Sequence, residues 1–113
     1  MKNDCIFCAI EANEIKSEKL YEDENCFIIK DINPICKYHY LLIPKMHYAT
    51  ITEMPKGQAE ILGKCIALIP SLTSKLHLEN GYRLIINQGL DAGQGVMHLH
   101  VHILAGQKMN FAV

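Results

Sequence analysis

Tryptophan is absent from this chain of 113 residues, and neither sign of charge dominates, since 11 Lys and Arg stand against 12 Asp and Glu. The net charge of -1 provides no basic footprint for a nucleic-acid duplex, so we expect no such partner. No apolar run approaches the roughly 20 residues that cross a bilayer, and the N-terminus has no apolar signal-peptide region. We therefore expect a cytoplasmic protein with no membrane partner.

Cysteine is present at five positions, in a chain that we expect to lie in a reducing compartment. Thiols or metal ligands are then favoured over disulfides. Half of the residues are hydrophobic, which is enough for a real core, and we expect residues 1–113 to form one domain.

Apolar and polar patterns predict an α+β fold, with an antiparallel sheet of about five strands, one long helix and a short N-terminal helix. The long helix is expected over residues 56–77, with Thr50 and Glu53 spaced as a capping box before it. Pro70 is expected to kink that helix or to start a second segment. The short helical segment is expected over residues 4–12, and the strands over 18–21, 25–31, 38–43, 82–87 and 97–105.

Three histidines, His98, His100 and His102, alternate with aliphatic residues near the C-terminus. Because successive side chains of a strand point to opposite faces, this pattern predicts three imidazoles in a row on one face. They can be surface histidines, ligands of a catalytic zinc, or a nucleophile or general base with its positioning neighbours. Three imidazoles in a straight row span too far for one tetrahedral ion, which favours the last interpretation.

A glycine-rich loop with Gly89, Gly93 and Gly95 precedes these histidines. Glycines free backbone N–H groups to form an anion-binding nest. Imidazoles beside such a loop indicate chemistry on a phosphate.

Cys5 and Cys8 form a Cys-x-x-Cys pair, a spacing common in zinc sites. A redox pair or two buried thiols would give the same pattern, so the residues alone leave the alternatives open.

The run from His98 to Leu104 resembles the signature of the histidine-triad family, in which three histidines alternate with apolar residues. Residues 31–34, His39 and residues 42–47 are similar to another block of that family. Residues 81–87 with Gly93 and Gln94 resemble its Hint branch in particular.

This resemblance implies a homodimeric hydrolase of purine nucleoside 5′-phosphoramidates. His100 would attack the α-phosphorus to form a covalent nucleotidyl-imidazole, and His102 would contact the phosphate oxygens. His39 would join the triad by hydrogen bonds, and His98 would be an orienter or a metal ligand. The alternatives are a dinucleoside polyphosphate hydrolase and a nucleotide-binding or scaffolding module with little turnover.

The resemblance also implies a binding site for the nucleotide. Asp31 would accept both ribose hydroxyls, although a turn residue after a strand is the alternative. Asn87, Gly93 and Gln94 would line the phosphate or leaving group, and Asn87 alone can be a turn cap. Gly95 replaces the Ser or Thr usual in Hint-type enzymes, which would lower the rate or change the preferred leaving group. The apolar purine pocket would comprise Ile6, Phe7, Ile10, Ile29, Ile32 and Leu41, all of which could equally be ordinary core.

By the same resemblance, Cys5 and Cys8 would join His47 and His98 around a zinc ion. A closed Cys₂His₂ set is structural, because no coordination position stays open for chemistry. The zinc would tie the N-terminus to the histidine strand, and the chemical step would need no cofactor.

Overall fold

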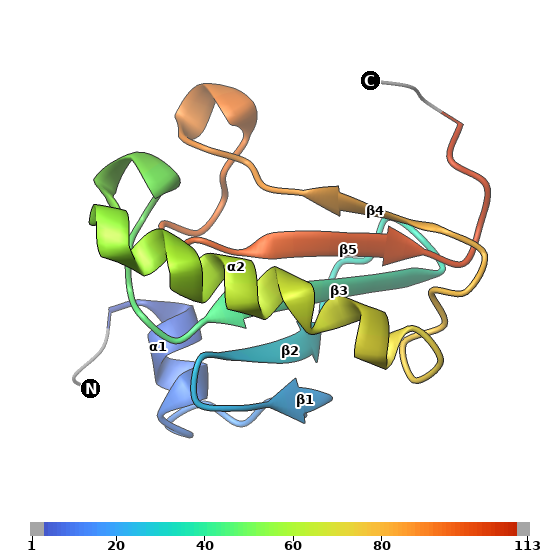
Figure 1. Cartoon of the computed structure of the whole chain (residues 1–113), viewed down its shortest axis with the longest axis horizontal. Helices are drawn as coiled ribbons and strands as arrows, with labels where there is room; N and C mark the ends of the chain where they lie inside the picture. The colour runs from blue at the N-terminus through green and yellow to red at the C-terminus, as the bar shows by residue number, and fades with distance from the viewer. Residues whose placement is uncertain (1–3, 111–113) are drawn as a thin grey trace.

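Five antiparallel strands in the order β1-β2-β3-β5-β4 form the sheet of the computed structural model, which describes residues 4–110. Two α-helices and four short 3₁₀ segments complete the described chain (Figure 1). The strands are β1 (Tyr21–Glu22), β2 (Cys26–Lys30), β3 (Tyr38–Pro44), β4 (Tyr82–Ile85) and β5 (Val101–Ala105), the α-helices are α1 (Ile6–Glu11) and α2 (Ala59–Ala67), and the 3₁₀ segments are η1 (Ile51–Glu53), η2 (Lys56–Gln58), η3 (Ile69–Leu72) and η4 (Leu90–Ala92). The predicted α+β class and five-stranded antiparallel sheet are confirmed.

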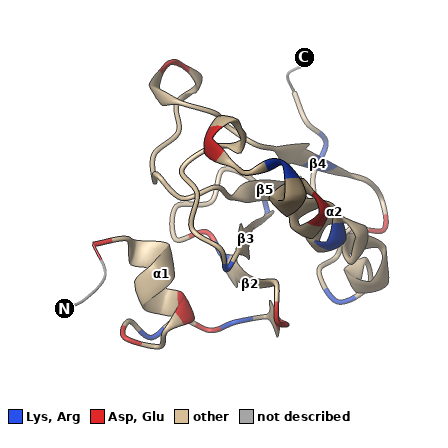
Figure 2. Ribbon diagram, turned by 60° about the vertical axis from the view of Figure 1, so that its left-hand side comes forward, with Lys and Arg blue, Asp and Glu red and all other residues tan. Residues whose placement is uncertain are grey.

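The sheet is covered on both faces, which explains why β2 is a continuous apolar run. Ile28 faces a core that contains Cys65 of α2, whereas Phe27 faces a second core with Phe7 and Ile10 of α1. Alternate residues of one strand thus serve opposite cores. Figure 1 shows α2 crossing the front of the sheet, and Figure 2 shows the two helices on opposite sides of it.

The register of the central strands places two histidines on the α1 face. His102 of β5 lies opposite Leu41 of β3, and Leu41 packs in the α1 core. His39 is two residues before Leu41, so its side chain points to the same face. The sheet therefore brings His39 and His102 together from segments far apart in the sequence.

The long helix is confirmed, but it is shorter than predicted. α2 ends at Ala67, and Pro70 lies in the first turn of the separate segment η3. Proline is compatible with a first turn, where its missing N–H has no partner to lose. The predicted capping box does not form, because Thr50 makes no side-chain hydrogen bond and residues 51–53 form a 3₁₀ turn.

The histidine strand is also shorter than predicted, since β5 begins at Val101 and not near residue 97. The N–H of Leu99 donates to the carbonyl of Tyr48 at 2.7 Å, outside the sheet ladder. His98 and His100 therefore precede the regular strand, and only His102 lies in it. Strand β4 likewise ends at Ile85, two residues before Asn87. Among the described residues, none of the helices is long and apolar enough to cross a membrane.

Candidate functional site

The four histidines at residues 39, 98, 100 and 102 gather on the α1 face, where β5 begins. His98 and His100 are buried, with 1% and 7% of their surface exposed. The ring of Phe7 from α1 meets both of them edge-on, with centroid distances of 5.8 Å and 5.1 Å. The rings of His100 and His102 are neighbours at 5.1 Å. Phe7 thus packs against the rings of His98 and His100, which are shielded from water.

His100 is held in one tautomer by the backbone. Its Nδ1 lies 2.7 Å from the carbonyl oxygen of His98. A carbonyl only accepts hydrogen bonds, so Nδ1 carries the proton and donates it. The neutral ring then has its lone pair on Nε2, which is the form that can attack an electrophile.

His102 is oriented through His39. The N–H of Ile35 donates to Nδ1 of His39 at 3.2 Å, so the proton of neutral His39 lies on Nε2. That Nε2 is 2.9 Å from Nδ1 of His102 and 3.3 Å from a carboxylate oxygen of Asp31. Donation to His102 leaves the His102 proton on Nε2, as a donor at the open end of the ring.

Burial sets the charge of these two rings. It lowers the pKa of His39, and the nearby Asp31 carboxylate opposes the shift only in part. Burial is also the largest cause lowering the pKa of His102, with His100 and His39 adding to it. Both rings are therefore neutral at neutral pH, as the hydrogen-bond chain requires.

Asp31, His39 and His102 have potential ligand atoms that all lie within 4.8 Å of one another. A metal there would have to displace the proton from Nε2 of His39. Because the Ile35 N–H occupies the other nitrogen, this proton cannot simply move across the ring. The cluster therefore suits a hydrogen-bond relay better than a metal ion.

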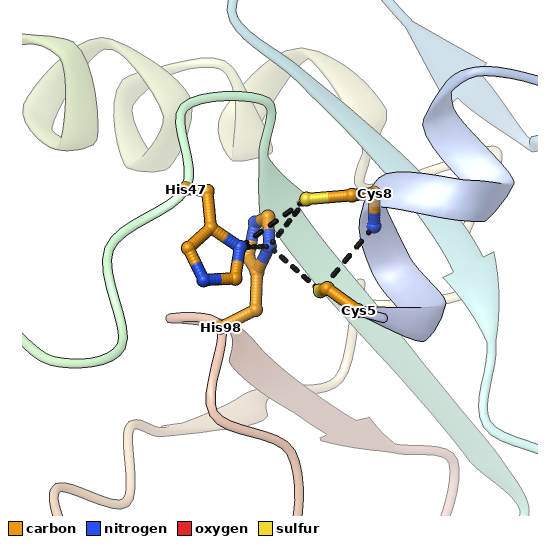
Figure 3. Close-up of side chains that lie close together, drawn as sticks. All are labelled: Cys5, Cys8, His47 and His98. Atoms are coloured by element: carbon orange, nitrogen blue, oxygen red, sulfur yellow. Dashed lines mark hydrogen bonds between the residues drawn. The ribbon is translucent and has the colours of Figure 1, made fainter. Parts of the chain in front are cut away.

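A second cluster joins the N-terminal cysteines to two histidines (Figure 3). Sγ of Cys5 is 3.3 Å from Nδ1 of His98, and Sγ of Cys8 is 3.2 Å from Nδ1 of His47. The two Nδ1 atoms are 3.0 Å apart. The structure brings together all four residues that the sequence predicted as zinc ligands.

The donor chemistry of this cluster fits zinc. His98 donates its Nε2 proton to the carbonyl of Pro44 at 2.7 Å, which leaves the Nδ1 lone pair facing the cluster. Zinc bonds of about 2.0–2.3 Å in a tetrahedron separate N–N and S–N pairs by about 3.4–3.6 Å, close to the separations found here. Burial, followed by contact with Cys5, raises the pKa of Cys8 to about 11, and a bound cation would counter that effect.

The predicted purine-pocket residues divide into two groups. Phe7, Ile10, Ile29 and Leu41 are buried together in the core on the α1 face. Two others stand at the surface, since Ile6 is 45% and Ile32 is 89% exposed. Without a ligand, the first group is ordinary core, and the second is free to contact one.

The glycine-rich loop is closed by Gln94, whose side chain is buried. Its Oε1 accepts from the N–H of Gly89 at 2.8 Å, and its Nε2 donates to the carbonyls of Ala49 and Val96. Both amide hydrogens are used, so the side chain has no donor left for a phosphate. In the structure Gln94 closes the loop, and its predicted place lining the phosphate or leaving group stays a prediction.

Among the described residues, no hydrogen bond joins the other predicted loop residues, Asn87, Gly93 and Gly95, to the histidines. Gly89 and Gly93 have φ of 89° and 84°, as expected for the turns of a glycine loop. Gly95 lines a surface hollow beside the cysteine cluster, together with Cys5 and His47. Asn87 is half-buried beyond the end of β4.

Sequence reasoning did not identify which backbone groups set the ring protons. These are the N–H of Ile35 and the carbonyl of Pro44, along with the carbonyl of His98 itself. Every residue has such groups, so residue type carries no signal for them. Only the fold shows which ones face a ring.

Comparison with known proteins agrees with this geometry. The family model described as HIT domain matches residues 12–109. The adenylylsulfatase HINT3 of Arabidopsis thaliana is 38% identical over 104 residues, which are 92% of this chain and 53% of that protein.

Two solved structures extend the comparison. A histidine triad protein from Clostridium difficile has a TM-score of 0.92 and 38% identity, over 100% of this chain and 99% of that one. A zinc-bound histidine triad family protein from Mycobacterium smegmatis has a TM-score of 0.79 and 32% identity, over 95% and 78%. The chain belongs to the HIT domain family, and hydrolase is the class of activity that this membership supports.

Proposed function

We propose that this protein hydrolyses purine nucleoside 5′-phosphoramidates, of the type in which AMP is joined to an amine. The observation that carries the proposal is the tautomer of His100, because its Nδ1 proton is tied to the His98 carbonyl. The free Nε2 is then a nucleophile without any further proton transfer. The adenylylsulfatase relative acts by name on a compound in which an adenylyl group carries a leaving group.

The reaction proceeds in two steps. Nε2 of His100 bonds to the α-phosphorus while the bond from phosphorus to the amine nitrogen breaks, and the leaving nitrogen takes a proton from solvent and departs as the amine. His102 donates its Nε2–H to a phosphate oxygen and stabilises the charge that develops there. Water then attacks the phosphorus, breaks the bond to His100 and releases the nucleotide and a proton.

The remaining residues bind the substrate. Asp31 accepts the ribose hydroxyls with the carboxylate that also faces His39. Ile6 and Ile32 contact the purine against the apolar layer of the α1 face, and Asn87, Gly93 and Gly95 lie around the phosphate and leaving group. A zinc ion held by Cys5, Cys8, His47 and His98 has a structural role.

We also propose that residues 1–113 work as one cytoplasmic domain in a homodimer. Strand β4 is an edge of the sheet, with Tyr82 40% and Leu84 37% exposed. An edge strand with exposed apolar side chains suits pairing with another copy. The dimer would place two sites in one assembly.

Two substitutions test the nucleophile. We expect His100→Ala to lower the turnover of an adenosine phosphoramidate by about a thousandfold or more, because the covalent route is lost. The matched control is Lys64→Ala, on the exposed side of α2, which should retain full activity. Release of the amine measures turnover, and equal rates for the two variants would overturn the assignment.

Substrate class is tested on the same preparations. Diadenosine polyphosphates and adenylyl sulfate are compared with the phosphoramidate by kcat/KM. A higher value for a polyphosphate would make the dinucleoside hydrolase the correct function. Tight nucleotide binding with turnover no faster than that of His100→Ala would instead indicate a binding module.

A further inference from the structure

A cavity of about 320 Å³ lies between the end of β2, the start of β3 and the turn at residues 75–77 that follows η3. Tyr40 and Leu76 in its wall belong to the α2 core, whereas the histidine cluster lies on the α1 face. Asp31 and His39 lie at the border between the two places. Apart from Asp31 and His39, the proposed hydrolase mechanism uses none of the residues that line this cavity.

Three lysines, Lys30, Lys37 and Lys75, line the cavity, and Asp31 is the one carboxylate among its lining residues. Within residues 4–110 none of these lysines forms an ion pair. Lys19 and Lys45, by contrast, both pair with Glu22. The chain has a net charge of -1, so this concentration of unpaired positive charge is local.

The lysines are held around one opening. Lys75 donates to the carbonyl of Leu20, and Nζ of Lys37 lies 5.6 Å from the centroid of the Tyr38 ring. The Tyr38 ring stacks on His77 with centroids 4.4 Å apart. His77 has a φ of 61°, a left-handed conformation that is costly for a side chain other than glycine and is kept here in an ordered turn.

The same aromatic pair borders a second hollow of about 520 Å³. That hollow shares Lys37, Tyr38 and His77 with the first and adds Lys108. Four lysines thus line two hollows that share the Tyr38–His77 pair, against the two carboxylates Asp31 and Glu79.

We infer that the cavity of about 320 Å³, here called the Tyr38–His77 cavity, binds a multiply charged phosphate group such as pyrophosphate. Like charges around one cavity repel one another, and an anion with two or more charges removes that repulsion. Ammonium groups serve as point-charge donors to phosphate oxygens in many orientations, which suits a diphosphate held by flexible side chains. The inference rests on the lysine geometry and stands independently of the proposed hydrolase activity.

The test is titration of the full, zinc-loaded chain with pyrophosphate, in the presence of saturating AMP to occupy the histidine site. We expect one pyrophosphate per chain, with a Kd that weakens about tenfold or more in the double variant Lys37→Gln, Lys75→Gln. The control, Lys56→Gln with Lys64→Gln, removes the same charge outside the cavity and should change the Kd less than about twofold.

Three results would overturn the inference. One is no binding to the wild-type chain at millimolar pyrophosphate, and another is equal weakening in both double variants, which would indicate only long-range charge. The last is a loss of pyrophosphate binding in His102→Ala while the Lys37, Lys75 variant binds as tightly as the wild type. That result would place the anion in the histidine site. Phosphoramidate turnover by the Lys37, Lys75 variant is measured separately. Failure of the pyrophosphate site can then be distinguished from failure of the proposed hydrolase activity.

Discussion

At the scale of single residues, the sequence singled out the histidines that the fold brings together, but not their tautomers. The alternation of His98, His100 and His102 singled out the site, and the resemblance separated their roles. The tautomers depend on backbone carbonyl and N–H groups of residues 35, 44 and 98. Such groups cannot be picked out from residue type, because nearly every residue has them. Three imidazoles that look equivalent in the sequence therefore have different hydrogen-bond partners, and we propose for them the roles of a metal-facing ring, a nucleophile and a donor.

Gly106 is a residue whose role the sequence did not indicate. Its φ is 90°, and a Cβ built there would lie 2.3 Å from Cδ2 of Tyr38. We expect Gly106→Ala to lower the free energy of unfolding by about 2 kcal/mol or more, because strain and a clash add together.

Urea denaturation measures this change. Gly57→Ala is the matched control, since Gly57 has no atom within 4 Å of a built Cβ. The control should alter stability by less than about 0.5 kcal/mol. Similar effects at the two glycines would contradict the close approach of Tyr38 to Gly106.

At the scale of elements, types were predicted better than boundaries. The apolar run of β2 was correctly predicted to be a strand, and Pro70 was correctly expected to interrupt the long helix. The start of β5, by contrast, was predicted four residues too early. That start depends on Leu99 pairing with Tyr48, a contact between distant loops that periodicity cannot show. A tertiary hydrogen bond thus determines where the regular strand β5 begins.

Helix α1 is the element that depends most on the cysteine cluster. It has six residues, well below the about 12–15 that a helix needs to be stable alone. Its N-cap is Cys5, whose Sγ accepts from the N–H of Cys8. We expect removal of zinc by a chelator to lower Tm by about 5 °C or more, because binding energy is lost from the folded state.

Zinc content and thermal scans measure this prediction. Wild-type protein should hold about one zinc per chain, and Cys8→Ser should hold less than half of that. Cys36→Ser is the matched control, since that thiol contacts Met109 outside the cluster. Full zinc in Cys8→Ser would show that the metal lies elsewhere.

At the scale of the whole molecule, the buried histidines make stability depend on pH. Burial lowers the pKa of His39 and of His102 below 6.5, the ordinary value. Below pH 6.5 the unfolded chain takes up protons that the folded chain resists, so unfolding becomes easier as pH falls toward the folded pKa values. We expect a loss of about 1 kcal/mol or more between pH 7.5 and pH 5.

Urea midpoints across that range measure the loss. His102→Gln removes one of the two groups, so its stability should depend less steeply on pH than that of the wild type. Stability that rises on acidification, or an unchanged slope in His102→Gln, would contradict the assignment of neutral buried rings.

Assembly is a second property of the whole molecule. Exposed Tyr82 and Leu84 on edge strand β4 lead us to expect a dimer in sedimentation velocity. Leu84→Lys should shift the population toward monomer, because a charge on a flat edge opposes pairing. A wild-type chain that sediments as a monomer at high micromolar concentration would exclude the dimer.

The contacts of the histidines differ widely in how much chain they span. His98 and His100 are joined across two residues, whereas 54 residues separate His98 from Pro44 and 63 separate His39 from His102. Short loops close at little entropic cost, so the tautomer of His100, the proposed nucleophile, is set by its own neighbourhood. Distant segments supply Phe7, which packs on its ring, and Pro44 and His39, which bond to its neighbours. Under the proposed function, changes in those segments would alter which molecule is cleaved, while the tautomer of His100 stays the same.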